Sequence, residues 1–459
     1  MTKNNKRFKM ITSIALALLL CLNMALPALA ADYSEGTDAA NPARAALTKI
    51  LKMPVETPTP TANFIFTFDK VGMNEPTDNS TTALAGMPTI PNMTINYTGA
   101  AGDGTTIIDG DVKNVVKQTG NFLASITPAM WVNGEGVYKY TVTESTTSNI
   151  PIGDPDLEWA TYSTASYDVE IWIDRDSTGT LFPRYVVVRI IPGSEDEYYI
   201  DNGTPANGKV DPTPDGGKTT PGTPPTIEED FSQVIFTNNY WKTDGGGPTD
   251  PETSALEIIK SITGIGSDPT KYFTFSVKVT LSSAIPPTAI QTYKAYVMLG
   301  SNVVTSAANG TMSGTDATGG YFMFTSGTER TGINLTNDQR LVFVDLPIGS
   351  NVEVFETADT QYRPSYQRTF AGTGEFTAAV NTTFGFPRPG TGTGYDPGPH
   401  RTIAGASANK ATFTNTRSGA TPTGILVDNL PYIALLGLSL VSLVGLVAYK
   451  SRKRARNNV

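Results

Sequence analysis

The sequence has almost no cysteine and almost no histidine. Among its 459 residues there is one of each, Cys21 and His400. Cys21 lies in an N-terminal apolar run, so the rest of the chain has no thiol to form a disulfide, bind a metal or act as a nucleophile. A single histidine supplies neither a Ser-His-Asp set nor a histidine cluster for a metal. We therefore expect no metal site, no cofactor and no enzyme of these kinds.

An excess of positive charge is also missing. Charged residues make up 17% of the chain, and the formal net charge is −9. Proteins that bind nucleic acid usually present a basic surface. The composition therefore argues against nucleic acid as a partner.

The N-terminus predicts export. A positively charged head, MTKNNKRFKM, is followed by the apolar run ITSIALALLLCLNMAL and by the small-residue site Ala28-Leu29-Ala30. Together these features are typical of a secretory signal peptide, which we place at residues 1–30. We expect the mature chain to begin near Ala31.

The C-terminus predicts an anchor at residues 421–456. LPYIALLGLSLVSLVGLVAY, at 430–449, is uncharged and about 30 Å long as a helix, enough to cross a bilayer, and the basic KSRKRAR follows it. Thr421, Pro422, Thr423 and Gly424 precede this stretch. The combination looks like a Gram-positive sortase sorting signal of the variant form found in major pilins. That resemblance implies cleavage between Thr423 and Gly424; the alternative is an ordinary single-pass anchor with a chance Pro-Thr-Gly.

The region between the two ends has the pattern of β-strands. Its apolar residues mostly alternate with polar ones, as in FIFTF, YKYTVTE, YDVEIWI, YFTFSVKVT and VEVFE, and Gly, Pro, Asn and Asp clusters separate these runs. Such spacing predicts an all-β protein built from antiparallel sandwiches. We expect two domains, at 40–242 and 252–418, with an exposed Pro/Gly-rich loop or linker at 203–230.

The two predicted domains share an order of polar residues. Each opens with a strand that carries a lysine (LTKIL and EIIKSI), continues to a strand that ends in glutamate (YKYTVTE and NVEVFE), and closes with F-T-N (VIFTNN and ATFTNT). The corresponding residues are Lys49 and Lys260, Glu144 and Glu356, and Asn238 and Asn415.

Strand geometry places all six on the apolar face of their own strands, because successive side chains alternate between faces. The threonine of each F-T-N is expected to face outward. An unpaired lysine or carboxylate buried in this way costs several kcal/mol, so each needs a partner. Two choices stay open in the first domain, because Lys52 competes with Lys49 and Asn239 with Asn238. Lys52 would lie on the other face, beside Ile50.

These positions and their surroundings resemble the streptococcal pilin isopeptide linkage domain. The first domain carries GVYKYTVTE and YSTASYDVEIWI, and the second carries LPIGSNVEVFE, with a Leu-Pro-x-Gly turn before the glutamate strand. The whole chain resembles a two-domain major pilin, the backbone subunit of a Gram-positive pilus. The resemblance implies two tandem immunoglobulin-like β-sandwiches of the collagen-adhesin B type.

The resemblance also implies a spontaneous isopeptide bond in each domain, between the lysine nitrogen and the asparagine carboxamide carbon. Burial favours a neutral, nucleophilic amine and a protonated carboxyl group. The glutamate would act as the catalyst, with its protonated carboxyl hydrogen-bonded to the asparagine carbonyl. Each site would react once with itself, so the protein would not be an enzyme. The loops closed are roughly 150 to 190 residues long, and the chain-entropy model gives about 5 kcal/mol for each.

Polymerisation is a separate implication of the resemblance. In major pilins a sortase joins the C-terminal threonine of one subunit to a lysine near the end of the next subunit's first domain. Lys209 and Lys218 lie in the matching region and are candidates, although each is also readily explained as a solvated loop lysine. The partners implied are a sortase transpeptidase and further copies of the chain, with peptidoglycan, minor pilins and host surface ligands as additional ones.

We therefore expect a secreted shaft subunit at the cell surface, in the wall or in a pilus. A monomeric wall-anchored adhesin with a stalk of the same domains is the alternative. It would normally have an extra binding domain, for which the sequence leaves little room. A secreted enzyme is disfavoured, because no plausible polar catalytic group lies outside the two lysine-glutamate-asparagine sets.

Overall fold

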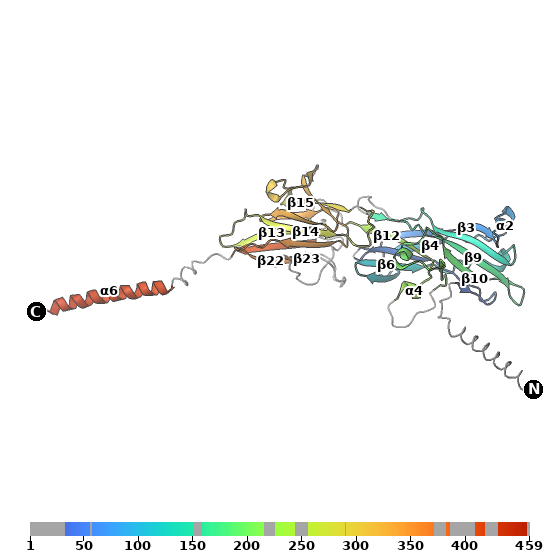
Figure 1. Ribbon diagram of the computed structural model, residues 1–459, viewed down its shortest axis with the longest axis horizontal. Helices are drawn as coiled ribbons and strands as arrows, with labels where there is room; N and C mark the ends of the chain where they lie inside the picture. The colour runs from blue at the N-terminus through green and yellow to red at the C-terminus, as the bar shows by residue number, and fades with distance from the viewer. Residues whose placement is uncertain are drawn as a thin grey trace, which may run out of the picture.

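The computed structural model describes residues 33–55, 57–150, 158–214, 225–243, 256–289, 291–370, 382–385, 409–417 and 430–456. These residues form two β-sandwiches that lie end to end along the long axis of the molecule (Figure 1). Most of the regular structure is strand. The predicted all-β class with two tandem sandwiches is therefore confirmed.

The first sandwich packs a seven-stranded sheet against a five-stranded one. The larger sheet has the order β1-β10-β9-β7-β3-β4, with β11 paired to β10, and the smaller has the order β5-β6-β2-β12-β8. The bounds are β1 Ser34–Glu35, β2 Thr48–Pro54, β3 Thr61–Met73, β4 Met93–Thr98, β5 Thr105–Asp109, β6 Val112–Gln118, β7 Gly136–Glu144, β8 Glu158–Ala160, β9 Ser166–Arg175, β10 Leu181–Ile190, β11 Lys209–Val210 and β12 Ile235–Lys242.

The second sandwich packs an eight-stranded sheet against a four-stranded one. The larger sheet has the order β17-β18-β15-β20-β13-β24-β22, with β16 paired to β15, and the smaller has the order β19-β14-β21-β23. The bounds are β13 Leu256–Gly264, β14 Phe273–Thr280, β15 Thr292–Leu299, β16 Asn302–Val303, β17 Gly314–Thr315, β18 Gly320–Thr325, β19 Glu329–Leu335, β20 Gln339–Phe343, β21 Asn351–Glu356, β22 Arg363–Phe370, β23 Thr382–Gly385 and β24 Asn409–Arg417.

Burial follows the alternation expected of strands that have one face on a core. Along β7 the buried residues are Tyr138, Tyr140, Val142 and Glu144, so the glutamate does lie on the apolar face. Strand β2 is different, because nearly every residue in it is buried. Its outward face is partly covered as well, because Ile50 lies in a groove that Tyr198 and Ile227 also line.

The described helices of the first sandwich are short: α2 Thr81–Ala85, α3 Glu197–Asn202 and α4 Ile227–Asp230. Helix α3 begins at its N-cap Asp196 and packs against β12. It covers Thr237, which is only 6% exposed. The sequence placed this threonine on the outer face of β12; it does turn away from the core, but α3 shields it from solvent. Within the predicted loop at 203–230, the described parts include β11 and α4.

The two sandwiches touch directly at their junction. Trp241, near the end of β12, packs into the core of the second sandwich and stacks on Trp159, with ring centres 5.9 Å apart. The Ile348 N–H donates to the carbonyl oxygen of Lys242 at 3.0 Å. The Asp111 carboxylate accepts hydrogen bonds from the N–H of Ser283 at 2.9 Å and from its hydroxyl at 2.7 Å. Strand β12 therefore leads out of the first sandwich and into contact with the second.

The two predicted terminal segments fare differently. The expected signal peptide at 1–30 lies outside the described residues. Residues 430–456 form one helix, α6, from Leu430 to Arg456. Within the part of the chain that the structure describes, no helix is both long and apolar enough to cross a membrane, so the predicted span at 430–449 is not confirmed.

Candidate functional site

Each sandwich pairs its first core strand with its last one, side by side and parallel. In the first sandwich β2 runs beside β12, with Lys49 opposite Phe236 and Leu51 opposite Asn238. The second repeats this arrangement in β13 and β24, where Lys260 lies opposite Phe413 and Ile262 opposite Asn415. The offset of two residues between lysine and asparagine is therefore the same in both. Because side chains alternate, lysine and asparagine point to the same face of the sheet.

The glutamates come from the opposite sheet of each sandwich. Glu144 is the last residue of β7 and pairs with Phe66 of β3. Glu356 is the last residue of β21 and pairs with Phe275 of β14. In both sandwiches the carboxyl group thus reaches across the core toward the lysine and the asparagine.

The first set consists of Lys49, Glu144 and Asn238. The side chains of the lysine and the glutamate have no solvent exposure, and Asn238 is fully buried. Lys49 Nζ donates to Glu144 Oε2 at 2.9 Å and to the Phe236 carbonyl at 3.1 Å, and it also contacts Asn238 Oδ1. Asn238 Nδ2 donates to Glu144 Oε1 at 2.7 Å. The structure therefore brings together all three residues that the sequence proposed.

The second set, Lys260, Glu356 and Asn415, has nearly the same contacts. Lys260 Nζ donates to Glu356 Oε2 at 3.1 Å and to the Phe413 carbonyl at 3.2 Å. Asn415 Nδ2 donates to Glu356 Oε1 at 2.5 Å. The asparagine oxygens differ, because Asn238 Oδ1 is contacted by Lys49 Nζ whereas Asn415 Oδ1 has no hydrogen-bond partner among the described residues.

Aromatic rings enclose both sets. Lys49 Nζ lies 4.5 Å from the centre of the Phe64 ring, and Lys260 Nζ lies 4.3 Å from that of Phe273. These rings sit on β3 and β14, at the alternating runs FIFTF and YFTFSVKVT that predicted strands. They exclude water from the lysines while still offering an electron-rich face to a cation.

Burial shifts the proton equilibria in the direction that the chemistry needs. Desolvation lowers the pKa of Lys49 below its usual value, although the attraction of Glu144 opposes the change. Desolvation also lowers the pKa of Lys260 to about 8. The pKa of Glu356 is raised, again mainly by desolvation. In the second set both shifts are toward a neutral amine beside a protonated acid.

In each set the glutamate carboxyl group contacts both the lysine Nζ, which would form the new bond, and the asparagine Nδ2, whose bond would break. Its Oε2 accepts from the lysine amine, and its Oε1 accepts from the asparagine amide nitrogen. Such a carboxyl can accept a proton from one nitrogen and give one to the other. This differs from the sequence-based interpretation, in which glutamate hydrogen-bonds the asparagine carbonyl.

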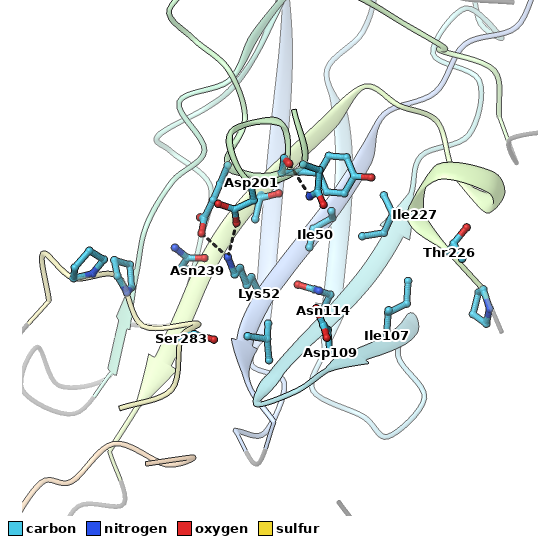
Figure 2. Close-up of a pocket in the computed structure, with 18 of the residues that line it drawn as sticks. Ile50, Lys52, Ile107, Asp109, Asn114, Asp201, Thr226, Ile227, Asn239 and Ser283 are labelled. Atoms are coloured by element: carbon cyan, nitrogen blue, oxygen red, sulfur yellow. Dashed lines mark hydrogen bonds and ion pairs between the residues drawn. The ribbon is translucent and has the colours of Figure 1, made fainter. Parts of the chain in front are cut away.

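The two choices left open by the sequence are separated by geometry. Lys52 points away from the first set, into a groove where it pairs with Glu197 at 2.7 Å and Asp201 at 3.2 Å (Figure 2). Asn239 lines the same groove. It is Lys49 and Asn238, therefore, that meet Glu144.

Sequence reasoning missed two residues beside the first set. The backbone N–H of Ser163 donates to Asn238 Oδ1 at 2.9 Å. Asp196, which is 2% exposed, accepts from the Ser163 hydroxyl at 2.9 Å. Both lie in irregular segments between strands, where no alternation of apolar residues marks the inward face.

The residues predicted to take part in assembly are only partly described. Lys209 is half-buried in the short strand β11, opposite Arg189 of β10, rather than in a loop. Lys218 and the predicted sorting motif, Thr421 to Gly424, lie outside the described residues.

The fold and the two sets define a class of protein: tandem β-sandwiches, each with a lysine, a glutamate and an asparagine joined by hydrogen bonds in its core. A family model described as a Domain of unknown function (DUF7601) matches residues 254–417, which run from the start of β13 to the end of β24. No curated protein sequence matches the chain.

Several solved structures are similar to the chain. One is the major pilin protein T3.2 from Streptococcus pyogenes, at 17% identity over 84% of this chain and 100% of that one, with a TM-score of 0.26. The major pilin protein T-13 from Streptococcus pyogenes gives 18% identity over 84% and 100%, with a TM-score of 0.25. A pilus-presented adhesin gives 10% identity over 81% and 100%, with a TM-score of 0.22. Superpositions with such low TM-scores carry no functional conclusion, so the function is inferred from the chain's own residues.

Proposed function

We propose that this protein is a structural subunit of a Gram-positive surface pilus, braced by an isopeptide bond that each sandwich forms by itself. The observation that carries the proposal is the repeated set: a buried lysine, glutamate and asparagine in hydrogen-bond contact, at the same register, in both sandwiches. A buried ion pair with no further role is costly to keep, since apolar residues of similar size often stabilise a core as well or better.

The proposed reaction balances within each set. The lysine amine, made neutral by passing a proton to the glutamate, attacks the asparagine Cγ, and the C=O electron pair moves to Oδ1. The Cγ–Nδ2 bond then breaks as the glutamic acid gives a proton to Nδ2 and takes one from Nζ. The electron pair on Oδ1 re-forms the C=O bond, ammonia leaves, an amide joins the two strands, and the glutamic acid keeps the proton that it took from the lysine. No oxidant, metal or cofactor is needed.

The position of the bonds suits a protein under tension. Lys49 lies near the start of β2 and Asn238 in the middle of β12, and these parallel neighbours run in the same direction. Tension that enters before β2 would pass through the cross-link to β12 and leave toward the second sandwich. The residues between the two ends of the bond would carry none of it. Lys260 and Asn415 repeat this arrangement in β13 and β24.

Assembly is proposed from the sequence. A sortase would cleave between Thr423 and Gly424 and join Thr423 to a lysine of the next subunit, with Lys209 and Lys218 as candidates. The product would be a covalent polymer of this chain at the cell surface or in the wall. Half-burial of Lys209 in β11 counts against it, because an acceptor amine must reach the active site of another enzyme.

The intact mass of a recombinant chain spanning residues 31–418 tests the chemistry. Two bonds predict a mass lower than that of the sequence by two molecules of ammonia, and Lys260→Ala should restore one of them. An unmodified mass in the folded wild-type chain would refute the isopeptide mechanism.

A monomeric wall-anchored adhesin is the second candidate, and one observation favours it. A groove of about 880 Å³ lies at the junction, bordered by β2, β5, β6, α3 and the 283–288 segment of the second sandwich (Figure 2). Such a volume suits a small ligand or a peptide side chain. Cell-wall extracts boiled in denaturant and blotted for the protein distinguish the two: a high-mass ladder indicates a polymer, and a single band indicates an adhesin.

A further inference from the structure

The carbonyl oxygen of Asn238 has a partner that its counterpart lacks. The Ser163 N–H donates to Asn238 Oδ1 at 2.9 Å, whereas Asn415 Oδ1 accepts no hydrogen bond from any described residue. Glu144 does not serve this oxygen, because its own two oxygens are engaged by the nitrogens of Lys49 and Asn238. The Ser163 N–H therefore gives Asn238 Oδ1 a hydrogen bond that Glu144 does not provide.

A buried carboxylate fixes the position of this donor. Asp196 is 2% exposed, and one of its oxygens accepts from the Thr237 N–H at 2.7 Å and from the Ser163 hydroxyl at 2.9 Å. Its other oxygen accepts from the Thr237 hydroxyl at 2.6 Å and from the Tyr198 N–H at 3.0 Å. The same carboxylate thus ties the Ser163 segment to β12, at the residue directly before Asn238.

We propose that the Ser163 N–H stabilises the oxyanion that develops on Asn238 during bond formation, and that Asp196 is a positioning residue for this donor. The inference rests on the isopeptide chemistry proposed above. When Lys49 Nζ attacks Cγ, negative charge moves onto Oδ1, and a fixed donor about 2.7–3.1 Å away stabilises that charge without having to reorient. The burial of the site strengthens the interaction, since no water competes for the oxyanion.

The test follows both bonds in one molecule. Full-length chain collected unfolded from inclusion bodies is refolded by dilution at a series of pH values, stopped in strong denaturant at timed intervals and digested. Mass spectrometry then gives the fraction of each cross-linked peptide, 49–238 and 260–415. The second bond serves as an internal control for folding and for the chemistry itself.

Three substitutions distinguish the role of the Ser163 N–H donor from that of Asp196, which positions it. Ser163→Pro removes the N–H, and the 49–238 bond should form about 100-fold more slowly, as when one oxyanion donor is lost elsewhere. Asp196→Ala releases the Ser163 segment and should slow the same bond about 10-fold or more. Asp196→Asn keeps an oxygen for the Ser163 hydroxyl and the Thr237 N–H but turns an NH2 group toward the Tyr198 N–H, so its rate should lie between those of wild type and Asp196→Ala. Thr164→Pro is the matched control, because it puts the same ring on the next, exposed residue and keeps the donor.

The pH series distinguishes a lost donor from a loosened site. Loss of the donor should lower the rate at every pH without moving the pH at which it is greatest, because Lys49 and Glu144 keep their surroundings. Water entering a damaged site would instead shift the profile by restoring an ordinary pKa to Lys49. A shifted profile in both Ser163→Pro and Asp196→Ala overturns the proposal, as does an unchanged 49–238 rate in both. So does an Asp196→Asn rate as low as that of Asp196→Ala.

The failure of this inference is separate from the failure of the proposed function. If neither bond forms in the wild-type chain, the isopeptide proposal itself is wrong. If both form in the wild type and the 49–238 bond is indifferent to Ser163 and Asp196, only the oxyanion role is wrong.

Discussion

Replacing Lys49 with methionine and Glu144 with glutamine in the same chain removes the proposed cross-link of the first sandwich without leaving an unpaired charge. Methionine fills the space of the lysine stem beneath Phe64, and glutamine can still hydrogen-bond Asn238. A single Glu144→Gln change would be harder to interpret, because it leaves a buried lysine without its counter-charge, which by itself costs about 3–5 kcal/mol.

The expected effect follows from the length of the loop. The two ends of the bond are 189 residues apart. In the chain-entropy model, closing a loop of this length lowers the entropy of the unfolded chain enough to stabilise the fold by about 5 kcal/mol at 25 °C. For a domain of this size each kcal/mol shifts the melting temperature by about 2–4 °C, so the double variant should melt roughly 10–20 °C below wild type.

Differential scanning calorimetry of the recombinant ectodomain measures this shift, and intact mass confirms that the variant has lost one cross-link. The matched control is Lys52→Met on the same strand. Lys52 is partly exposed and paired with Glu197 and Asp201, so its removal should cost about 1 kcal/mol or less. A double variant that melts within about 2 °C of wild type would refute the reasoning, as would a double variant destabilised no more than Lys52→Met.

Three further predictions concern the second sandwich. Glu356→Gln cannot transfer the proton, so the chain should retain the ammonia of Asn415 while the first bond still forms, as peptide mapping of both sites would show. The rate at which the 260–415 bond forms during refolding should pass through a maximum as the pH is raised. Below the raised pKa of Glu356 both Lys260 and Glu356 are protonated, and above about pH 8 both are deprotonated. Only between these limits does the pair hold the one proton that the transfer uses. A monotonic rise through pH 10 would contradict this shared-proton mechanism. In the Asn415→Ala variant Lys260 stays unreacted, and its pKa is about 8 in the folded chain against an ordinary value of 10.5. Between these two pH values the folded state binds fewer protons than the unfolded state. The free energy of unfolding should therefore rise with pH across that window. Guanidinium denaturation at pH 8 and pH 9.5 checks the sign, and the same chain with Lys260→Met should lack this contribution.

The arrangement of the two sets was largely predictable from alternation. Lys49, Glu144 and Asn238 each fall on the apolar side of a strand, and a buried polar group must find a partner. The same reasoning puts Lys52 on the opposite side of β2 from Lys49, because the two lie an odd number of residues apart. The order lysine, glutamate, asparagine occurs in both domains. This repetition indicated which three residues belong together, which a single domain would not have shown.

The support around the first set was not predictable in this way. Ser163 and Asp196 lie in irregular segments, and each meets β12 only because the chain folds back over it. Alternation has no meaning in such segments, and a serine or aspartate there is most simply explained as a turn or cap residue. The burial of Thr237 under α3 has the same origin. The direction in which the glutamate carboxyl faces is likewise a property of the packed core and not of the strand.

The order of the elements along the chain leads to a last prediction, about extension under force. Beyond Asn238, β12 continues to Lys242 and the junction, and Lys260 then begins the next cross-linked loop. With both bonds formed, the stretch between Asn238 and Lys260, about 22 residues and so roughly 75 Å when extended, is the only interior chain that tension can lengthen. The contacts that hold it, such as the stacking of Trp241 on Trp159, would give way without unfolding either sandwich.

Single-molecule pulling from the two ends of the ectodomain should therefore show no step as long as a whole domain. The Lys49→Met/Glu144→Gln chain should release a further step of roughly 600 Å, because its 189-residue loop is no longer closed. Extension steps as long as a whole domain in the wild-type chain would mean that tension passes through the sandwiches. Such steps would refute the structural role proposed for the bonds.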